Sequence, residues 1–144
     1  MSKLVLSTSA MHEDFFTDTA MIGIGTAQPG YRFCWILNRY FDLSFLRDPE
    51  QNICLQKKDS QYFFPIYRYD LPNSCHKYLL YKLKNGTESL LPETRLLDYL
   101  WLIQTASPEE DARKIANELR NIPEVQLAQI LDASQLKNLN NLIV

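Results

Sequence analysis

Two carboxylates and a tyrosine stand close together in the sequence, at Glu93, Asp98 and Tyr99, where a polar stretch gives way to an apolar one. Two carboxylates in a partly apolar pocket can differ in proton affinity, so that one acts as an acid and the other as a base. Tyr99 would line such a pocket. In an extended chain, however, residues 93 and 98 point to opposite faces, which counts against a catalytic dyad.

The same stretch has a structural interpretation, which we favour. Pro92 lacks an N–H group and sets a kink at the entry to the segment. Glu93 can cap a helix or pair with an arginine, and Asp98 can fix the start of the following strand. Because spacing alone does not bring the two carboxylates together, the sequence assigns no catalytic residue.

The sequence has few other residues of the types that bind phosphates or metals or act as nucleophiles. Gly23, Gly25 and Gly30 precede a predicted helix, but their spacing matches neither the dinucleotide-binding fingerprint nor the P-loop. His12 and His76 have no partner at metal-ligand spacing, and the three cysteines form no C-x-x-C pair. We therefore expect reduced thiols, no metal, no cofactor and no catalytic triad.

The region around Glu93 and Asp98 resembles a family signature. The run Leu91-Pro92-Glu93, three further residues and Leu97-Asp98-Tyr99 are similar to the motif that gives the bacterial IPExxxVDY family its name, with leucine in place of isoleucine and valine. The resemblance extends to Ile22-Gly23-Ile24, residues 31–38, Ile122-Pro123 and residues 141–144, and so covers nearly the whole chain from Phe16. This family has no established activity, so the resemblance implies no substrate, cofactor or mechanism. The candidate functional or signature residues are Arg32, Asn38, Pro92, Glu93, Asp98 and Tyr99.

Residues 57–84 combine aromatic and basic side chains. Seven aromatic residues lie in this window, with six basic residues and only two acidic ones. Aromatic rings flanked by lysines on a sheet can stack and neutralise single-stranded RNA. Aromatic pairs across a half-buried sheet, with lysines protecting its edge, explain the same pattern. We favour the second explanation because no RNP-type motif is present, so we do not expect a nucleic-acid partner.

Length and composition indicate one domain over residues 1–144, of which residues 1–14 form a candidate mobile end. The chain has 46% hydrophobic residues and four glycines, and can therefore bury enough apolar surface to offset the entropy of ordering. Its formal net charge of −2 gives no general attraction to nucleic acid or to an anionic membrane. No stretch is apolar for long enough to cross a bilayer or to act as a secretory signal, so we expect a cytoplasmic protein.

Periodicity and turn residues predict an α+β domain. The predicted strands are residues 20–24, 61–69, 77–83, 98–104 and 125–131, with an Asn85-Gly86 hairpin between the third and the fourth. Predicted helices run from Tyr31 to Phe41, from Ser107, the N-cap of a capping box, to Pro123, and over residues 134–138. The order β-α-β, hairpin strands, β-α-β predicts about six largely antiparallel strands, both main helices on one face, and a ferredoxin-like half at the C-terminus.

Without a recognisable catalytic motif, we interpret the chain as a small non-catalytic binding protein that forms homo-oligomers and contacts a protein partner. A small-molecule-sensing regulatory domain is the main alternative, because ligands often bind paired β-α-β units at strand ends or dimer seams. An enzyme that uses Glu93, Asp98 or Arg32, and an RNA-binding protein that uses residues 57–84, are further alternatives.

Overall fold

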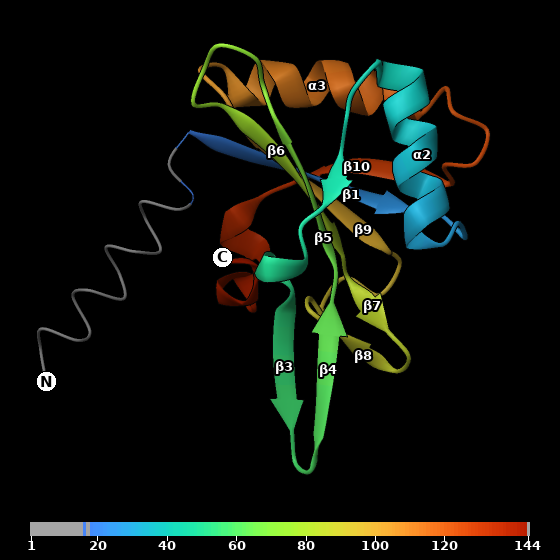
Figure 1. Cartoon of the computed structure of the whole chain (residues 1–144), viewed down its shortest axis with the longest axis vertical. Coiled ribbons are helices and arrows are strands. Elements are labelled where there is room, and N and C mark those ends of the chain that lie inside the picture. Colours follow the sequence, from blue (N-terminus) through green and yellow to red (C-terminus); the bar gives the residue numbers. More distant parts are fainter. Residues whose placement is uncertain (1–15, 17, 144) are drawn as a thin grey trace, which may run out of the picture.

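The structure is a computed structural model that describes Phe16 and residues 18–143 (Figure 1). These residues form a six-stranded, entirely antiparallel sheet with two helices packed on one face, which confirms the predicted α+β class. Smaller segments cover the opposite face. The candidate mobile end, His12 and Val144 lie outside the described residues.

The sheet strands, in their spatial order, are β10 (Leu127–Leu131), β1 (Thr19–Gly25), β9 (Tyr99–Gln104), β6 (Lys77–Lys82), β5 (Ile66–Asp70) and β2 (Leu46–Arg47). Because neighbours are antiparallel, β1 and β6 run parallel on either side of β9, and β9 and β10 run parallel on either side of β1. Helix α2 (Gly30–Phe41) follows β1, and α3 (Pro108–Leu119) connects β9 to β10. This is a ferredoxin-like strand order, and β9, α3 and β10 form its predicted C-terminal half.

Both helices form because their apolar residues recur at helical spacing and face the sheet. The buried residues of α2 are Gly30, Phe33, Cys34, Ile36 and Leu37, and those of α3 are Ala112, Ile115, Ala116 and Leu119. α3 starts where predicted, with Ser107 at the N-cap position and Pro108 in the first turn, but the predicted capping box is wrong because Ser107 makes no side-chain cap hydrogen bond. The start of the helix is instead joined to the end of β9 by the Thr105 hydroxyl, which donates to Asp111 at 2.6 Å. α3 also ends before Pro123, since Asn121 and Ile122 donate to carbonyls only three residues back.

The second face of the sheet is covered without a long helix. The covering segments are the β3–β4 hairpin (Ile53–Lys57 and Ser60–Phe64), the β7–β8 hairpin (Lys84–Asn85 and Glu88–Ser89), residues 90–98, and the short 3₁₀ helices η2 (Ala133–Gln135) and η3 (Leu139–Leu142). Leu90, Leu91 and Leu97 are buried here in one cluster with Leu100 and Leu102 of β9. Residues 90–98 therefore form part of a second hydrophobic core.

Pro65 divides the strand that was predicted over residues 61–69. β4 ends at Phe64 in the separate hairpin, and β5 begins at Ile66 in the main sheet. Proline has no N–H for a strand ladder, although the Pro65 carbonyl accepts a hydrogen bond from Lys82 N at 3.1 Å. The β3–β4 hairpin, whose first strand was not predicted, extends beyond the sheet (Figure 1). The 3₁₀ helix η1 (Pro49–Gln51) precedes it.

Candidate functional site

The signature segment, residues 91–99, lies on the sheet face opposite the helices and leads into β9. Leu91 and Leu97 are buried, whereas Pro92 is exposed. Thr94 N and Thr94 Oγ1 both donate to Leu91 O at 2.9 Å, and Leu97 N donates to Thr94 O at 3.1 Å. The segment is therefore a double turn held at both ends by buried leucines.

Glycines on β1 make room for the signature segment. A Cβ atom on Gly23 would overlap the Leu97 side chain, and one on Gly25 would lie 2.9 Å from the Leu96 carbonyl oxygen. Leu97 is 1% exposed, so it has little freedom to move aside. These glycines therefore serve close packing of the signature segment on β1.

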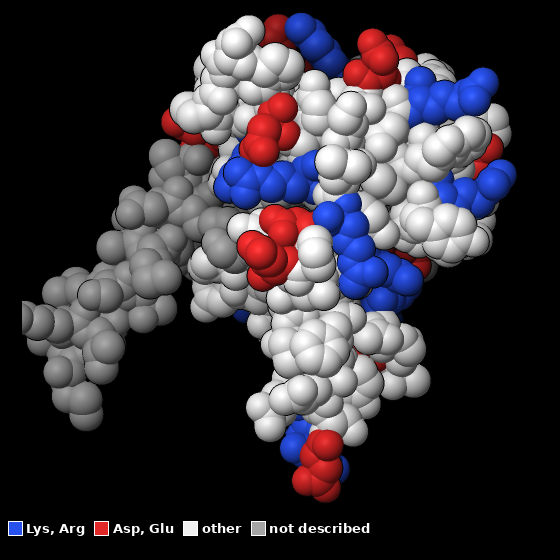
Figure 2. Space-filling view, viewed as in Figure 1, with Lys and Arg blue, Asp and Glu red and all other residues white. Residues whose placement is uncertain are grey.

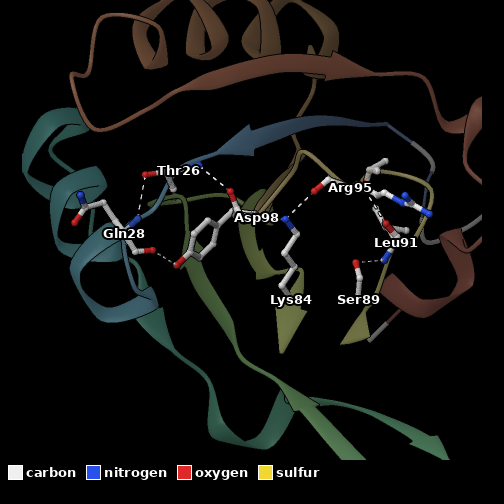
Figure 3. Close-up of polar contacts among 9 residues, drawn as sticks. Thr26, Gln28, Lys84, Ser89, Leu91, Arg95 and Asp98 are labelled. Carbon is white, nitrogen blue, oxygen red and sulfur yellow. Dashed lines mark hydrogen bonds and ion pairs between the residues drawn. The ribbon is translucent and has the colours of Figure 1, made fainter. Parts of the chain in front are cut away.

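Asp98 fastens the signature segment to the loop that leads into α2. One carboxylate oxygen accepts a hydrogen bond from Thr26 N at 3.0 Å, and the other lies 3.1 Å from Lys84 Nζ (Figure 3). Thr26 is 3% exposed, and its hydroxyl donates to Glu124 O at 2.6 Å. Asp98 and Thr26 thus join the starts of β9 and α2 to the loop before β10.

Tyr99 holds the same loop from the helix side of the sheet. Its ring centre lies 4.7 Å from that of Phe33 in α2, and its hydroxyl donates to Gln28 O at 2.7 Å. Burial raises the pKa of the Tyr99 hydroxyl above its ordinary value, so the group stays a neutral donor. Adjacent strand residues point to opposite faces of the sheet, so Asp98 and Tyr99 contact residues 26–28 from two sides, through Thr26 N and Gln28 O respectively.

Glu93 holds the C-terminal segment between η2 and η3. Its carboxylate accepts hydrogen bonds from Lys137 N at 2.6 Å, from Asn138 N at 2.9 Å and from Asn138 Nδ2 at 2.9 Å. Partial burial alone would raise the pKa of Glu93, but these hydrogen bonds outweigh it and hold the pKa below its ordinary value. Glu93 is therefore charged at neutral pH and holds the C-terminal segment through hydrogen bonds. We call a carboxylate that binds backbone amides of its own chain in this way a clasp.

Glu93→Gln is expected to lower the free energy of unfolding by about 1–2 kcal/mol at neutral pH. The amide removes the charge that strengthens the hydrogen bonds from Lys137 and Asn138, and screening by solvent at this exposed side chain keeps the loss small. A carboxyl with a lowered folded pKa stabilises the protein above its unfolded pKa of about 4.3, and that contribution is lost as the pH falls through the folded pKa. Urea unfolding of both proteins between neutral pH and about pH 3 should show a difference that shrinks on acidification. A difference that stays constant with pH would contradict this role.

The structure does not gather Glu93, Asp98 and Arg32 into one site. Arg32 donates from Nε to Gln28 Oε1 at 3.0 Å, whereas the two carboxylates contact the separate partners given above. An open pocket of about 510 Å³ beside the signature segment is lined by Glu93 and its neighbours and by Gln129, but not by Asp98 or Arg32. Among the described residues, no group of three or more His, Cys, Asp or Glu side chains is placed to hold a metal ion.

Asn38 is a structural residue at the end of α2. Its Oδ1 accepts a hydrogen bond from Phe45 N at 2.7 Å, and its Nδ2 donates to Phe45 O at 3.0 Å. Burial raises the pKa of the nearby Cys34 thiol to about 11, despite an opposing hydrogen bond from Asn38. Asn38 thus pins the chain that returns from α2 to the sheet, beside an unreactive core cysteine. The thiols of Cys54 and Cys75 are free and exposed.

The outer side of α2 carries large side chains that the core does not use. Tyr31 is 77% exposed and Trp35 is 53% exposed, and the Arg39 guanidinium carbon lies 5.4 Å from the centre of the Trp35 ring. We call Tyr31, Arg32, Trp35 and Arg39 the α2 outer face. Figure 2 shows basic side chains among uncharged surface over α2. Of this face only Arg32 was a candidate, although the four-residue spacing of Tyr31, Trp35 and Arg39 already marks one side of a helix.

Most aromatic rings of residues 57–84 pack inside the protein. Phe64, Tyr67 and Tyr81 are buried, whereas Phe63 is 52% exposed. Three of the basic side chains form ion pairs, which are Lys57–Glu88, Arg68–Asp70 and Lys84–Asp98. This arrangement favours cross-strand packing over stacking of RNA bases as the explanation of the pattern.

The sequence did not predict three residues whose groups bind the carboxylates of Glu93 and Asp98. These residues are Thr26, Lys84 and Asn138. Each is remote in sequence from its partner, so no local pattern could have identified it.

Comparisons with protein-family models, with curated proteins and with solved structures found no match. Membership of the IPExxxVDY family is therefore a proposal that rests on the residues that resemble it. Within residues 18–143, no helix is both long enough and apolar enough to span a membrane.

Proposed function

We propose that the chain is a non-catalytic binding protein and that the α2 outer face receives an acidic segment of a protein partner. The observation that carries this proposal is the exposure of Tyr31 and Trp35 beside Arg32 and Arg39, on a helix whose opposite side is packed into the core. Tyrosine, tryptophan and arginine supply much of the binding energy at protein interfaces. Because these side chains add little to the fold, binding is the better explanation for them.

The charge of α2 indicates the chemistry of the partner. The helix contains Arg32 and Arg39 and no acidic residue. Guanidinium groups pair with carboxylates through two parallel hydrogen bonds, and the Arg39 guanidinium lies over the Trp35 ring. A segment in which carboxylates flank an apolar side chain would therefore satisfy both the arginines and the exposed rings.

The signature residues support a non-catalytic interpretation. The polar groups of Glu93, Asp98 and Tyr99 are already bound within the same chain, by backbone groups and by the side chains of Asn138 and Lys84, so they are not free to act on a substrate. From the sequence resemblance, we further propose that the protein belongs to the bacterial IPExxxVDY family and acts in the cytoplasm.

A peptide-display selection tests the proposed function. A random peptide library is passed over immobilised wild-type protein, and the affinity of each enriched peptide is measured by fluorescence anisotropy. We expect acidic peptides with an apolar residue, whose affinity falls at least about tenfold in the Trp35→Ala/Arg39→Ala variant. Both substituted side chains are exposed, so the melting temperature should stay close to that of the wild type.

The matched control is Phe63→Ala/Lys58→Ala, which removes one exposed ring and one charge from the β3–β4 hairpin instead. It should bind the selected peptides as the wild type does. Failure to enrich any peptide, or equal binding by both variants, would overturn the proposal. A single-stranded oligonucleotide that binds the wild type but not the α2 variant would also overturn it, because phosphate would then replace carboxylate as the ligand.

A further inference from the structure

Strand β10 is an outer edge of the main sheet, and the strand itself lacks the residues that usually protect such an edge. Its residues, Leu127 to Leu131, include no charged residue and no proline, and Ile130 is 45% exposed. Natural edge strands are generally protected by charge, by proline or by being very short. The opposite edge, β2, is only two residues long. Among the described residues, no strand pairs with this edge, so β10 is the edge of the sheet that we consider for pairing with another strand.

Arg120 shows which backbone groups of β10 face outward. Its Nε and Nη2 donate to Ala128 O at 3.1 and 2.9 Å, while its Nη1 donates to Asn117 Oδ1 at 3.0 Å. The N–H and C=O groups of one strand residue point to the same side. Ala128 and Ile130 thus present their backbone groups to the free edge, and the Arg120 guanidinium covers one acceptor there.

We propose that the free edge of β10 binds β10 of a second copy of this chain, by antiparallel pairing about a two-fold axis at Gln129. In this register Leu127 lies opposite the partner's Leu131, and Ala128 lies opposite the partner's Ile130. A small residue then faces a large one, and no like charges are opposed. The inference concerns a different surface from the α2 outer face and does not depend on the proposed function.

The charges of α3 fit the same symmetry. Glu109 and Arg113, near the start of α3, line an open hollow of about 530 Å³ with Ile130, whereas Arg120, just after the end of α3, reaches Ala128. A two-fold axis at Gln129 brings the start of one α3 beside the end of the other. The Arg120 guanidinium can then leave the Ala128 carbonyl oxygen and pair with the carboxylate of the partner's Glu109. The Ala128 carbonyl oxygen is then free to accept a hydrogen bond from the N–H group of the partner's Ile130.

Sedimentation velocity over a wide range of protein concentration tests this inference. The wild type is expected to form a dimer, and Ile130→Lys should abolish it by placing a like charge on both sides of the axis. Glu109→Arg and Arg120→Glu should each weaken the dimer about tenfold or more, and the double reversal should restore it. Circular dichroism confirms that each variant is folded.

The control is Trp35→Ala/Arg39→Ala, which should dimerise as the wild type does, so that failure of the two proposals can be told apart. A wild type that is monomeric at every concentration would overturn the inference. So would a dimer that Ile130→Lys leaves intact, or a double reversal that remains as weak as the single ones.

Discussion

Gly23→Ala is expected to lower the free energy of unfolding by about 2 kcal/mol, although a glycine in a strand is normally replaced at little cost. The reason is that the new Cβ would overlap Leu97, which is buried between β1 and the second core. Leu97→Ala alone should cost about 3 kcal/mol through the cavity that it leaves. Urea unfolding of the double variant should cost clearly less than the sum of the two, because the cavity accommodates the added methyl group.

Gly86→Ala is the matched control for that cycle. Gly86 has φ +61° in the β7–β8 turn, and an added Cβ would meet nothing within 4 Å. Its substitution should cost about 1 kcal/mol through backbone strain alone, and Leu97→Ala should not change that cost. Additive effects of Gly23→Ala and Leu97→Ala would show that the signature segment does not pack on β1 as described.

Asp98→Ala is expected to lower the free energy of unfolding by about 2–3 kcal/mol, measured by the same urea titration. The substitution leaves the N–H of the buried Thr26 without its acceptor and removes the ion pair with Lys84. Most of the cost should come from the N–H group, because the Lys84 side chain is 38% exposed and its ion pair is screened by solvent.

Lys84→Met separates these two contributions. It leaves the hydrogen bond from Thr26 N in place, but it removes both the ion pair and the exposed hydrogen bond from Lys84 Nζ to Arg95 O at 2.7 Å, so together these should account for no more than about 1 kcal/mol. Equal losses of stability in Asp98→Ala and Lys84→Met would contradict this account. They would mean that the ion pair with Lys84, and not the hydrogen bond from Thr26 N, accounts for most of the stabilisation by Asp98.

The sequence predicts the elements whose apolar residues recur at a regular spacing. Apolar spacing located α2 and α3, and the apolar run before Ser107 located β9, because helices and inner strands repeat the same burial at each turn or residue. The β-α-β order then led to two helices on one face. Strand β3 was missed, since its alternation is short and it pairs only with β4 outside the main sheet.

The second core and the candidate site could not be predicted in the same way. Leu91, Leu97 and Leu142 come from turns and 3₁₀ helices, which have no long burial period. The hydrogen bond between Thr26 and Asp98 joins residues 72 positions apart, and only the folded sheet brings them together. The signature segment was recognised as a feature of sequence, whereas its partners depend on tertiary packing.

Amide hydrogen exchange, measured residue by residue with NMR, tests the central claim that the signature carboxylates are clasps on the backbone of their own chain. In the wild type, the amides of Thr26, Lys137 and Asn138 should be protected, because each donates to a signature carboxylate. In Glu93→Ala, the amides of Lys137 and Asn138 should lose this protection while that of Thr26 keeps it. Unprotected amides in the wild type, or the same protection of Lys137 and Asn138 in both proteins, would contradict the claim.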